Sequence, residues 1–138
     1  MTPQKHRMAT EAQKISVNAF RRHRGQRGEA LAARWLATQG YVIERTNVRF
    51  PVGELDLIAR EGDTLCFIEV RSADAGALVE PLATVDARKQ QRLIRAARWY
   101  VNRLRELPPE IRFDVVAVTW HPSGEPTFTL IRGAFDAE

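Results

Sequence analysis

The stretch RFDVVAVTW, residues 112–120, constrains the fold more than any other part of the 138-residue chain. Its middle is apolar with almost no alternation, which is typical of a central strand covered on both faces. A long helical pattern at roughly 85–105 precedes it and allows a crossover connection beside earlier strands. The sequence therefore predicts an α/β domain with a mixed central sheet and flanking helices.

The other apolar patterns give the order of the elements. One helical stripe ends at a glycine, three strand-like runs follow as a meander separated by tight turns, and the last run is expected at a sheet edge. The predicted elements are a helix at 28–40, strands at 41–50, 53–60 and 64–72, a helix at 85–105, and strands at 112–120 and 127–135.

Charge is distributed unevenly along the chain. Residues 1–27 and 85–105 each carry seven Lys or Arg against one acid, although the whole chain is only +4. Two basic segments beside an acidic remainder suit a protein that holds a polyanion near carboxylates. A solvated tail and helix face would give the same pattern. We expect residues 1–24 to be a flexible basic arm or a loosely attached helix, and 25–138 to be one domain.

Several classes of protein are disfavoured by composition. No apolar run reaches the roughly 20 residues that span a bilayer, and the N-terminus lacks the apolar region of a secretory signal. Cys66 is the only cysteine, so neither an internal disulfide nor a multi-cysteine metal site can form. We therefore expect a cytoplasmic protein without membrane contacts, with Cys66 as a core residue.

Charged residues close an otherwise apolar strand in LCFIEVRS, residues 65–72. Glu69 and Arg71 are two positions apart, so they share one face of that strand. If a two-residue turn precedes the strand, the residue numbers of two partners facing each other across the hairpin add up to 125. This register sets Asp56 opposite Glu69 and Glu54 opposite Arg71. A register shifted by one residue would send half of the apolar residues to the wrong face.

Two carboxylates that face each other across a β-ladder need a cation to offset their charge. Their Cβ atoms lie about 5 Å apart, and they repel unless something neutralises them. Oxygen ligands without His or Cys favour Mg²⁺ or Mn²⁺, and such ions typically serve phosphodiester hydrolysis. An ion pair between Glu54 and Arg71, with Glu69 reaching solvent, is the simpler alternative.

Five motifs in order resemble one bacterial protein family. They are GE at 28–29, GELDLIAR at 53–60, FIEVRS at 67–72, VDARKQQRL at 85–93 and RFDVVAV at 112–118. The chain resembles the YraN family of the restriction-endonuclease-like PD-(D/E)XK superfamily over residues 25–135. In outline it is also similar to archaeal Holliday-junction resolvases. The resemblance implies a restriction-endonuclease-like core.

The resemblance also implies roles for individual residues. Asp56 corresponds to the metal-binding Asp of the second strand, and Glu69 to the acid of the (D/E)XK element. Glu29 resembles an additional helix acid, although a first-turn acid favoured by the helix dipole is the alternative. Gln90 resembles a supporting polar residue, or is simply an exposed helix residue. Asp114 is expected to pair with an arginine.

The chain departs from the family pattern at Arg71, where the motif has lysine. A guanidinium can stabilise negative charge, but its pKa above 12 excludes a general-base role. It can also pair bidentately with Glu54 or Glu69 and compete with a metal ion. The sequence therefore fits both an enzyme that cleaves nucleic acid and a binding protein of the same fold that has lost catalysis.

Three functions follow as hypotheses. The first is a Mg²⁺- or Mn²⁺-dependent nuclease on DNA, including branched or junction DNA, in which Arg71 stabilises the transition state. The second is a catalytically impaired nucleic-acid-binding protein with the same fold, and the third is a protein-interaction scaffold. A homodimer is implied by analogy with resolvases, and Trp99 is expected to stack on a base or on an arginine. The residues expected to contact phosphates are Arg88, Lys89, Arg92 and Arg95.

Overall fold

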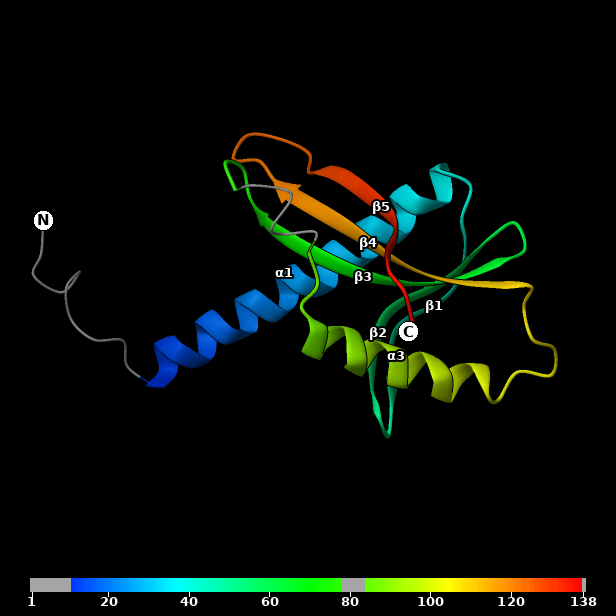
Figure 1. Cartoon of the computed structure of the whole chain (residues 1–138). Helices are drawn as coiled ribbons and strands as arrows, with labels where there is room; N and C mark the ends of the chain where they lie inside the picture. Colours follow the sequence, from blue (N-terminus) through cyan, green and yellow to red (C-terminus); the bar gives the residue numbers. More distant parts are fainter. Residues whose placement is uncertain (1–10, 78–83, 138) are drawn as a thin grey trace, which may run out of the picture.

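The computed structural model describes residues 11–77 and 84–137, with side chains from residue 25 onward. Helices and strands follow the predicted order (Figure 1). The elements are α1 (Glu11–Thr38), β1 (Val42–Phe50), β2 (Gly53–Glu61), β3 (Thr64–Asp74), α3 (Ala87–Val101), β4 (Glu110–Trp120) and β5 (Thr127–Phe135).

The five strands form one mixed sheet in the order β1-β2-β3-β4-β5. The pair β3–β4 is parallel, and the other three pairs are antiparallel. Helix α3 makes the crossover between the two parallel strands, as the apolar run at 112–120 predicts. Residues 113–118 of β4 are all buried, and β5 lies at the sheet edge. The mixed α/β architecture is therefore confirmed.

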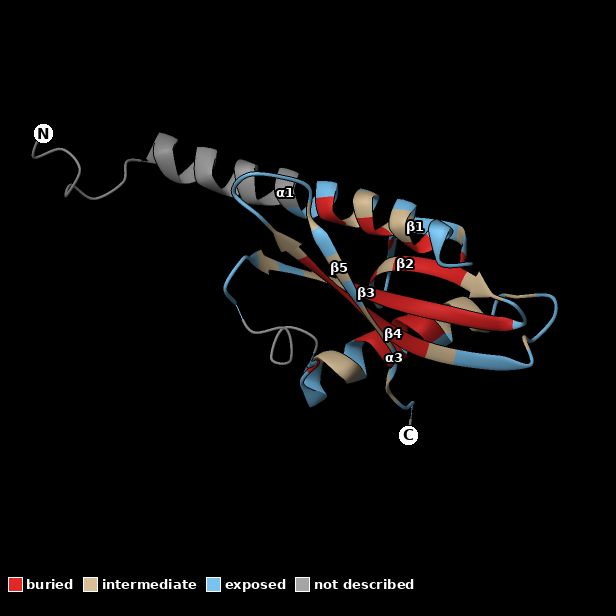
Figure 2. Cartoon of the chain, turned by 90° about the horizontal axis from the view of Figure 1, so that it is seen from above, coloured by how far each residue is buried: buried red, intermediate tan, exposed pale blue. Residues whose placement is uncertain are grey.

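The two helices cover opposite faces of the sheet (Figure 2). Each helix buries its small and branched residues against alternate side chains of the same strands, which divides the core into two layers. The α1 layer includes Ala32, Leu36, Leu57, Cys66, Ile68 and Val116. The α3 layer includes Ile58, Phe67, Leu93, Ile94, Ala97 and Val115. Cys66 is a buried core residue, as predicted.

The helix boundaries differ from the sequence expectation. Helix α1 begins at Glu11, well before Gly28, so its backbone includes part of the expected arm; residues 1–10 lie outside the described residues. Helix α3 ends at Val101 rather than near residue 105: the Asn102 amide still bonds to the Arg98 carbonyl, but the Arg103 and Leu104 amides bond to the carbonyls only three residues back, at Tyr100 and Val101. Within the described ranges, no helix is long and apolar enough to cross a membrane.

The β1–β2 hairpin tip packs closely on α3. Gly53 has a φ of 154°, and a Cβ at this position would lie 3.6 Å from the Ala96 Cβ and 3.8 Å from the Arg92 carbonyl oxygen. Beside it, the ring of Phe50 stacks on Trp99 with centroids 4.6 Å apart. A glycine permits this backbone where a side chain would be strained. The hairpin that carries Asp56 is thereby fixed to α3.

Candidate metal-binding site

The site lies where two strands part. Strands β2 and β3 pair in the predicted register, with Ile58 opposite Phe67, and their ladder ends at Leu57 and Ile68. The next polar contact between them is made by a side chain, because the Val70 amide donates to Asp56 Oδ2 at 2.8 Å. The carboxyl of Asp56 therefore fills the opening between the two strands.

Three predicted acids meet in this opening, and we call Glu29, Asp56 and Glu69 the acid cluster. The Asp56 carboxyl is within hydrogen-bonding reach of the carboxyls of both Glu69 and Glu29. Glu69 is only 6% exposed. Glu29 comes from α1 and the other two from the sheet. The structure thus brings together the helix acid and both strand acids that the sequence singled out.

Electrostatics of the acid cluster favour a bound proton or cation. Burial raises the pKa of Asp56 to about 9, helped by the hydrogen bond to Glu69 and by its charge, and opposed by the Val70 amide. Burial also raises the pKa of Glu29, opposed by its hydrogen bond with Asp56 and helped by the nearby Glu69 and Glu54 charges. Crowded acids of this kind take up protons unless positive charge replaces them.

A lysine on α3 supplies part of that positive charge. Lys89 Nζ lies 2.9 Å from Glu69 Oε2. Its position is fixed by the helix cap, since the Lys89 amide donates to the Asp86 side chain at 2.8 Å. The contact lacks hydrogen-bond geometry, and Glu69 Oε2 is buried without a hydrogen-bond partner. The sequence placed Lys89 among phosphate contacts, but its ammonium instead faces the acid cluster.

Arg71 and Glu54 are not joined as the register suggested. Arg71 Nη1 donates to the Thr84 carbonyl at 3.0 Å, which ties the end of β3 to the segment before α3. Glu54 pairs instead with Arg49 at 3.3 Å on an exposed surface. The expected pair between Glu54 and Arg71 fails because the strands diverge beyond Leu57. Glu54 therefore lies outside the acid cluster and contributes to it only through its charge.

Gln90 supports the helix start rather than the acids. Its side-chain amide donates to the Val85 carbonyl at 2.8 Å. This bond, together with the Asp86 cap, orders the first turn of α3, which carries Lys89. Gln90 is half-buried rather than exposed. A supporting role therefore fits, exerted through the helix.

A second group of charges lies at the other end of β2, and we call it the arginine cluster. Arg112 pairs with Asp114 at 2.8 Å, as predicted, and with Glu61 at 2.7 Å. Arg132 pairs with the other oxygen of Glu61 at 2.6 Å, and the Tyr41 hydroxyl donates to Asp114 at 2.8 Å. Arg112 and Asp114 are two positions apart on β4, whereas Tyr41, Glu61 and Arg132 lie far from them in sequence, so the fold brings the cluster together.

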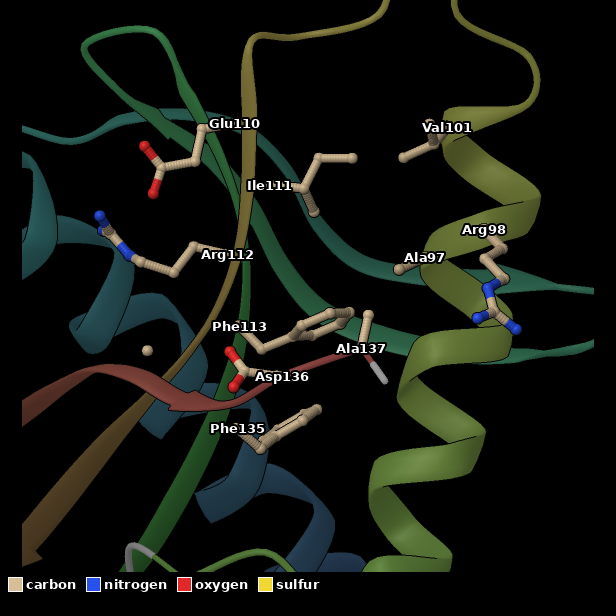
Figure 3. Close-up of a pocket in the computed structure, with 11 residues that line it drawn as sticks. Ala97, Arg98, Val101, Glu110, Ile111, Arg112, Phe113, Phe135, Asp136 and Ala137 are labelled. Carbon is tan, nitrogen blue, oxygen red and sulfur yellow. The ribbon is translucent and has the colours of Figure 1, made fainter.

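The cavity drawn in Figure 3 is separate from the acid cluster, although Arg112 of the arginine cluster is among the residues that line it. It encloses about 400 Å³ between α3 and strands β4 and β5. Its walls are mainly apolar on the α3 side, and the Arg112 and Glu110 side chains point away from α3. Asp56 and Glu69 do not line it. Chemistry at the acid cluster therefore does not use this cavity.

The acid cluster fits a hard divalent cation with few protein ligands. In the part of the chain that the structure describes, no group of three or more His, Cys, Asp or Glu side chains is arranged so that it could hold a metal ion. Two carboxylates are nevertheless enough for Mg²⁺, which keeps several waters and often binds substrate phosphate. The buried Oε2 of Glu69, which accepts no hydrogen bond and faces only the Lys89 ammonium at 2.9 Å, offers a ligand atom of that kind beside Asp56.

Comparisons with known proteins place the chain among bacterial relatives. Residues 28–118 match the uncharacterised protein family UPF0102. A UPF0102 protein of Symbiobacterium thermophilum is 45% identical over 113 residues, which is 82% of this chain and 96% of the relative. One from Chromohalobacter salexigens is 48% identical over 116 residues, or 84% and 93% of the two chains. The matched range includes the acid cluster and Lys89.

Proposed function

The chain belongs to the uncharacterised protein family UPF0102, and we propose that it is a metal-dependent nuclease that hydrolyses phosphodiester bonds in DNA, including branched or junction DNA. One observation carries the proposal. The nearly buried Glu69, whose Oε2 accepts no hydrogen bond and is paired with the Lys89 ammonium, lies beside a second carboxyl, Asp56, whose pKa is raised. Such perturbed acids occur preferentially at functional sites.

The arrangement of elements supports a restriction-endonuclease-like core of the PD-(D/E)XK superfamily. Asp56 lies on β2 and Glu69 on β3, at the point where the two strands separate. The order helix, meander, helix, strand, with β3 parallel to β4, agrees with the resemblance seen in the motifs. The fold alone does not assign an activity, so the proposal depends on the acid cluster.

In this proposal, Asp56 and Glu69 hold Mg²⁺ or Mn²⁺, with Glu29 assisting through its contact with Asp56. When bound, the ion activates water and stabilises negative charge on the phosphate. Lys89 offsets the negative charge of Glu69, which it contacts at 2.9 Å, and its flexible stem lets the ammonium turn toward a phosphate oxygen. The role first assigned to Arg71 passes to Lys89, because Arg71 is bound to the Thr84 carbonyl.

DNA is the proposed substrate because α3 is basic on its outer side. Arg88, Arg92 and Arg95 are all exposed and follow one another at helical spacing from the end that carries Lys89. Arginines so placed can neutralise successive phosphates. A symmetric homodimer, by analogy with resolvases, would present two such sites to a junction. Its existence can be checked by light scattering.

A second candidate function is a nucleic-acid-binding protein that has lost catalysis. The substitution of the motif lysine by Arg71, and the engagement of Arg71 with backbone, favour it. The two functions differ in their need for metal. A binding protein should hold DNA with a salt-dependent affinity that EDTA does not change.

Cleavage of labelled four-way, flap and single-stranded DNA in Mg²⁺, Mn²⁺ or EDTA tests the proposal. We expect the native chain to cut only with metal and Asp56→Asn to be inactive. Glu54→Gln is the matched control, because it removes an exposed carboxylate two residues away. If the native chain, Lys89→Arg and Arg71→Lys all fail to cut, the nuclease proposal is wrong. Salt-dependent binding would then support the second function.

A further inference from the structure

An open cavity of about 520 Å³ lies between β1 and the C-terminal part of α3, and we call it the aromatic cavity. It is distinct from the acid cluster. Three arginines and no acidic side chain are among the described residues that line it. Its lining consists of Arg45, Arg49, Phe50, Trp99, Tyr100, Arg103 and Leu104.

Planar groups are stacked in layers at this cavity. Phe50 lies on one face of Trp99, with centroids 4.6 Å apart and an interplanar angle of 25°. The Arg103 guanidinium lies 3.5 Å from the centroid of the same indole. Arg103 also donates to the Trp99 carbonyl at 2.8 Å, which holds it in place. The layers end in a guanidinium plane, on which a further flat ring can stack.

The cationic groups of the cavity are available to a ligand. Arg49 pairs with Glu54, and their side chains are 77% and 63% exposed, so water screens that pair. Glu44, the acid nearest to Tyr100, is already paired with Arg60 at 2.8 Å. The cavity therefore combines uncompensated positive charge with stacking surfaces, as sites for single-stranded nucleic acid do.

Helix α3 connects the aromatic cavity to the acid cluster. Arg88, Arg92, Arg95 and Trp99 follow one another at intervals of four, three and four residues, so they form one side of α3, and Arg103 follows in the turn just past its end. Ten residues separate Lys89 from Trp99, which corresponds to about 15 Å of helix. Successive phosphates of one strand advance about 3.4 Å each along the axis of a duplex, so a backbone that follows this side of α3 could contact several arginines.

We propose that the aromatic cavity holds an unpaired base of a single-stranded arm whose backbone follows the exposed arginines of α3. The proposal deepens the nuclease proposal and rests on it for the choice of nucleic acid as ligand. Bases inside a duplex already stack on one another, so only an unpaired base can use the aromatic layers. An acidic peptide could pair with the arginines, but it would leave these layers without a partner.

Binding of single-stranded and duplex oligonucleotides of equal length, measured by fluorescence anisotropy in EDTA, tests this inference without any need for cleavage. Trp99→Leu removes the indole, and Trp99→Phe retains a ring. Arg103→Ala removes the outer layer. Arg34→Ala, an exposed arginine on α1, is the matched charge control. A thermal melt of each variant checks that it remains folded.

We expect Trp99→Leu and Arg103→Ala to weaken single-strand binding about tenfold. Trp99→Phe and Arg34→Ala should change it about twofold or less. Duplex binding should change little in all four variants. Unchanged single-strand binding by folded Trp99→Leu would overturn the inference. So would equal competition by a poly-glutamate peptide of matched charge, which would indicate an acidic protein partner. A chain that cuts with metal but is indifferent to Trp99 would keep the nuclease proposal and lose this one. A chain that never cuts but needs Trp99 to bind single strands would keep the inference about the aromatic cavity and reject the nuclease proposal.

Discussion

The two ends of β2 carry partly buried carboxyls in opposite electrostatic states. At the turn end, Glu61 lies between Arg112 and Arg132, whose hydrogen bonds outweigh its burial and lower its pKa to about 2. At the other end, Asp56 lies beside Glu69 and Glu29, and burial raises its pKa to about 9. The same strand therefore holds one carboxyl firmly ionised and another that retains a proton at neutral pH.

The difference between the two clusters lies in how many partners each acid has. In the arginine cluster, Asp114 is fully buried, but it accepts hydrogen bonds from Arg112, Tyr41 and the Gly133 amide. In the acid cluster, one lysine faces three carboxyls, and Glu69 Oε2 has no hydrogen-bond partner. A satisfied network specifies the fold, whereas an unsatisfied one costs stability and can be retained for binding.

The arginine cluster should give the largest loss of stability when it is broken. Arg112→Met leaves the buried Asp114 without its guanidinium, so we expect the free energy of unfolding to fall by about 3 to 5 kcal/mol. Urea unfolding followed by circular dichroism measures this. Arg132→Met, at a side chain that is 47% exposed, is the control and should cost about 1 kcal/mol or less. Equally small losses of unfolding free energy in Arg112→Met and Arg132→Met would contradict the view that the arginine cluster stabilises the fold through the buried Asp114.

Lys89 should matter for rate rather than for folding. Lys89→Met removes the cation beside Glu69, and we expect metal-dependent cleavage to fall about 100-fold, within the range typical of a positioned acid–base or electrostatic group. Single-turnover rates and a thermal melt separate activity from stability. Lys89→Arg keeps the charge and should restore part of the rate if charge alone is needed. An unchanged rate in folded Lys89→Met would remove this residue from the site.

Neutralising Asp56 should stabilise the metal-free chain. A carboxyl with a pKa of about 9 when folded and about 4 when unfolded makes the unfolding free energy fall as pH rises between those values. Asp56→Asn removes this dependence, so we expect it to be more stable by about 2 kcal/mol at pH 8 in EDTA, with less difference at pH 5. Thermal unfolding at both pH values measures it. A destabilised Asp56→Asn would show that the ionised carboxylate holds the fold together.

Metal binding should release a proton from the acid cluster. Because the ion replaces the proton retained by Asp56, Mn²⁺ affinity should rise by up to tenfold per pH unit between about 6 and the Asp56 pKa of about 9. Isothermal titration in two buffers of different ionisation enthalpy counts the protons released. Glu54→Gln should retain this dependence. An affinity that does not change with pH would mean that the ion binds elsewhere.

Local patterns predicted the sheet well because strand order and register depend on turns and alternation. The Ile58–Phe67 pairing follows directly from the two-residue turn, and the parallel β3–β4 pair from the helix between them. Asp56 and Glu69 could be predicted as neighbours for the same reason. The start of α1 at Glu11 could not, because residues 11–27 show no apolar periodicity.

Contacts between elements were predicted less well. The register placed Arg71 with Glu54 on the assumption that the strands stay paired, whereas they part beyond Leu57. The role of Lys89 depends on how α3 lies across β3, which no local pattern specifies. Asp86 is recognisable in the sequence as a helix-capping residue, so it predicts where α3 begins. It does not predict which residue Lys89 contacts.

Helix α3 presents Lys89 at one end and Trp99 at the other. An α-helix turns about 100° and advances 1.5 Å with each residue, so one inserted or deleted residue between these positions would swing one of them away from its neighbours. The tip of the β1–β2 hairpin packs on the middle of the helix at Ala96 and Arg92, and this packing contact would be lost as well. Length changes among relatives should therefore fall in connecting loops, and the interval from Lys89 to Trp99 should remain ten residues throughout the lineage.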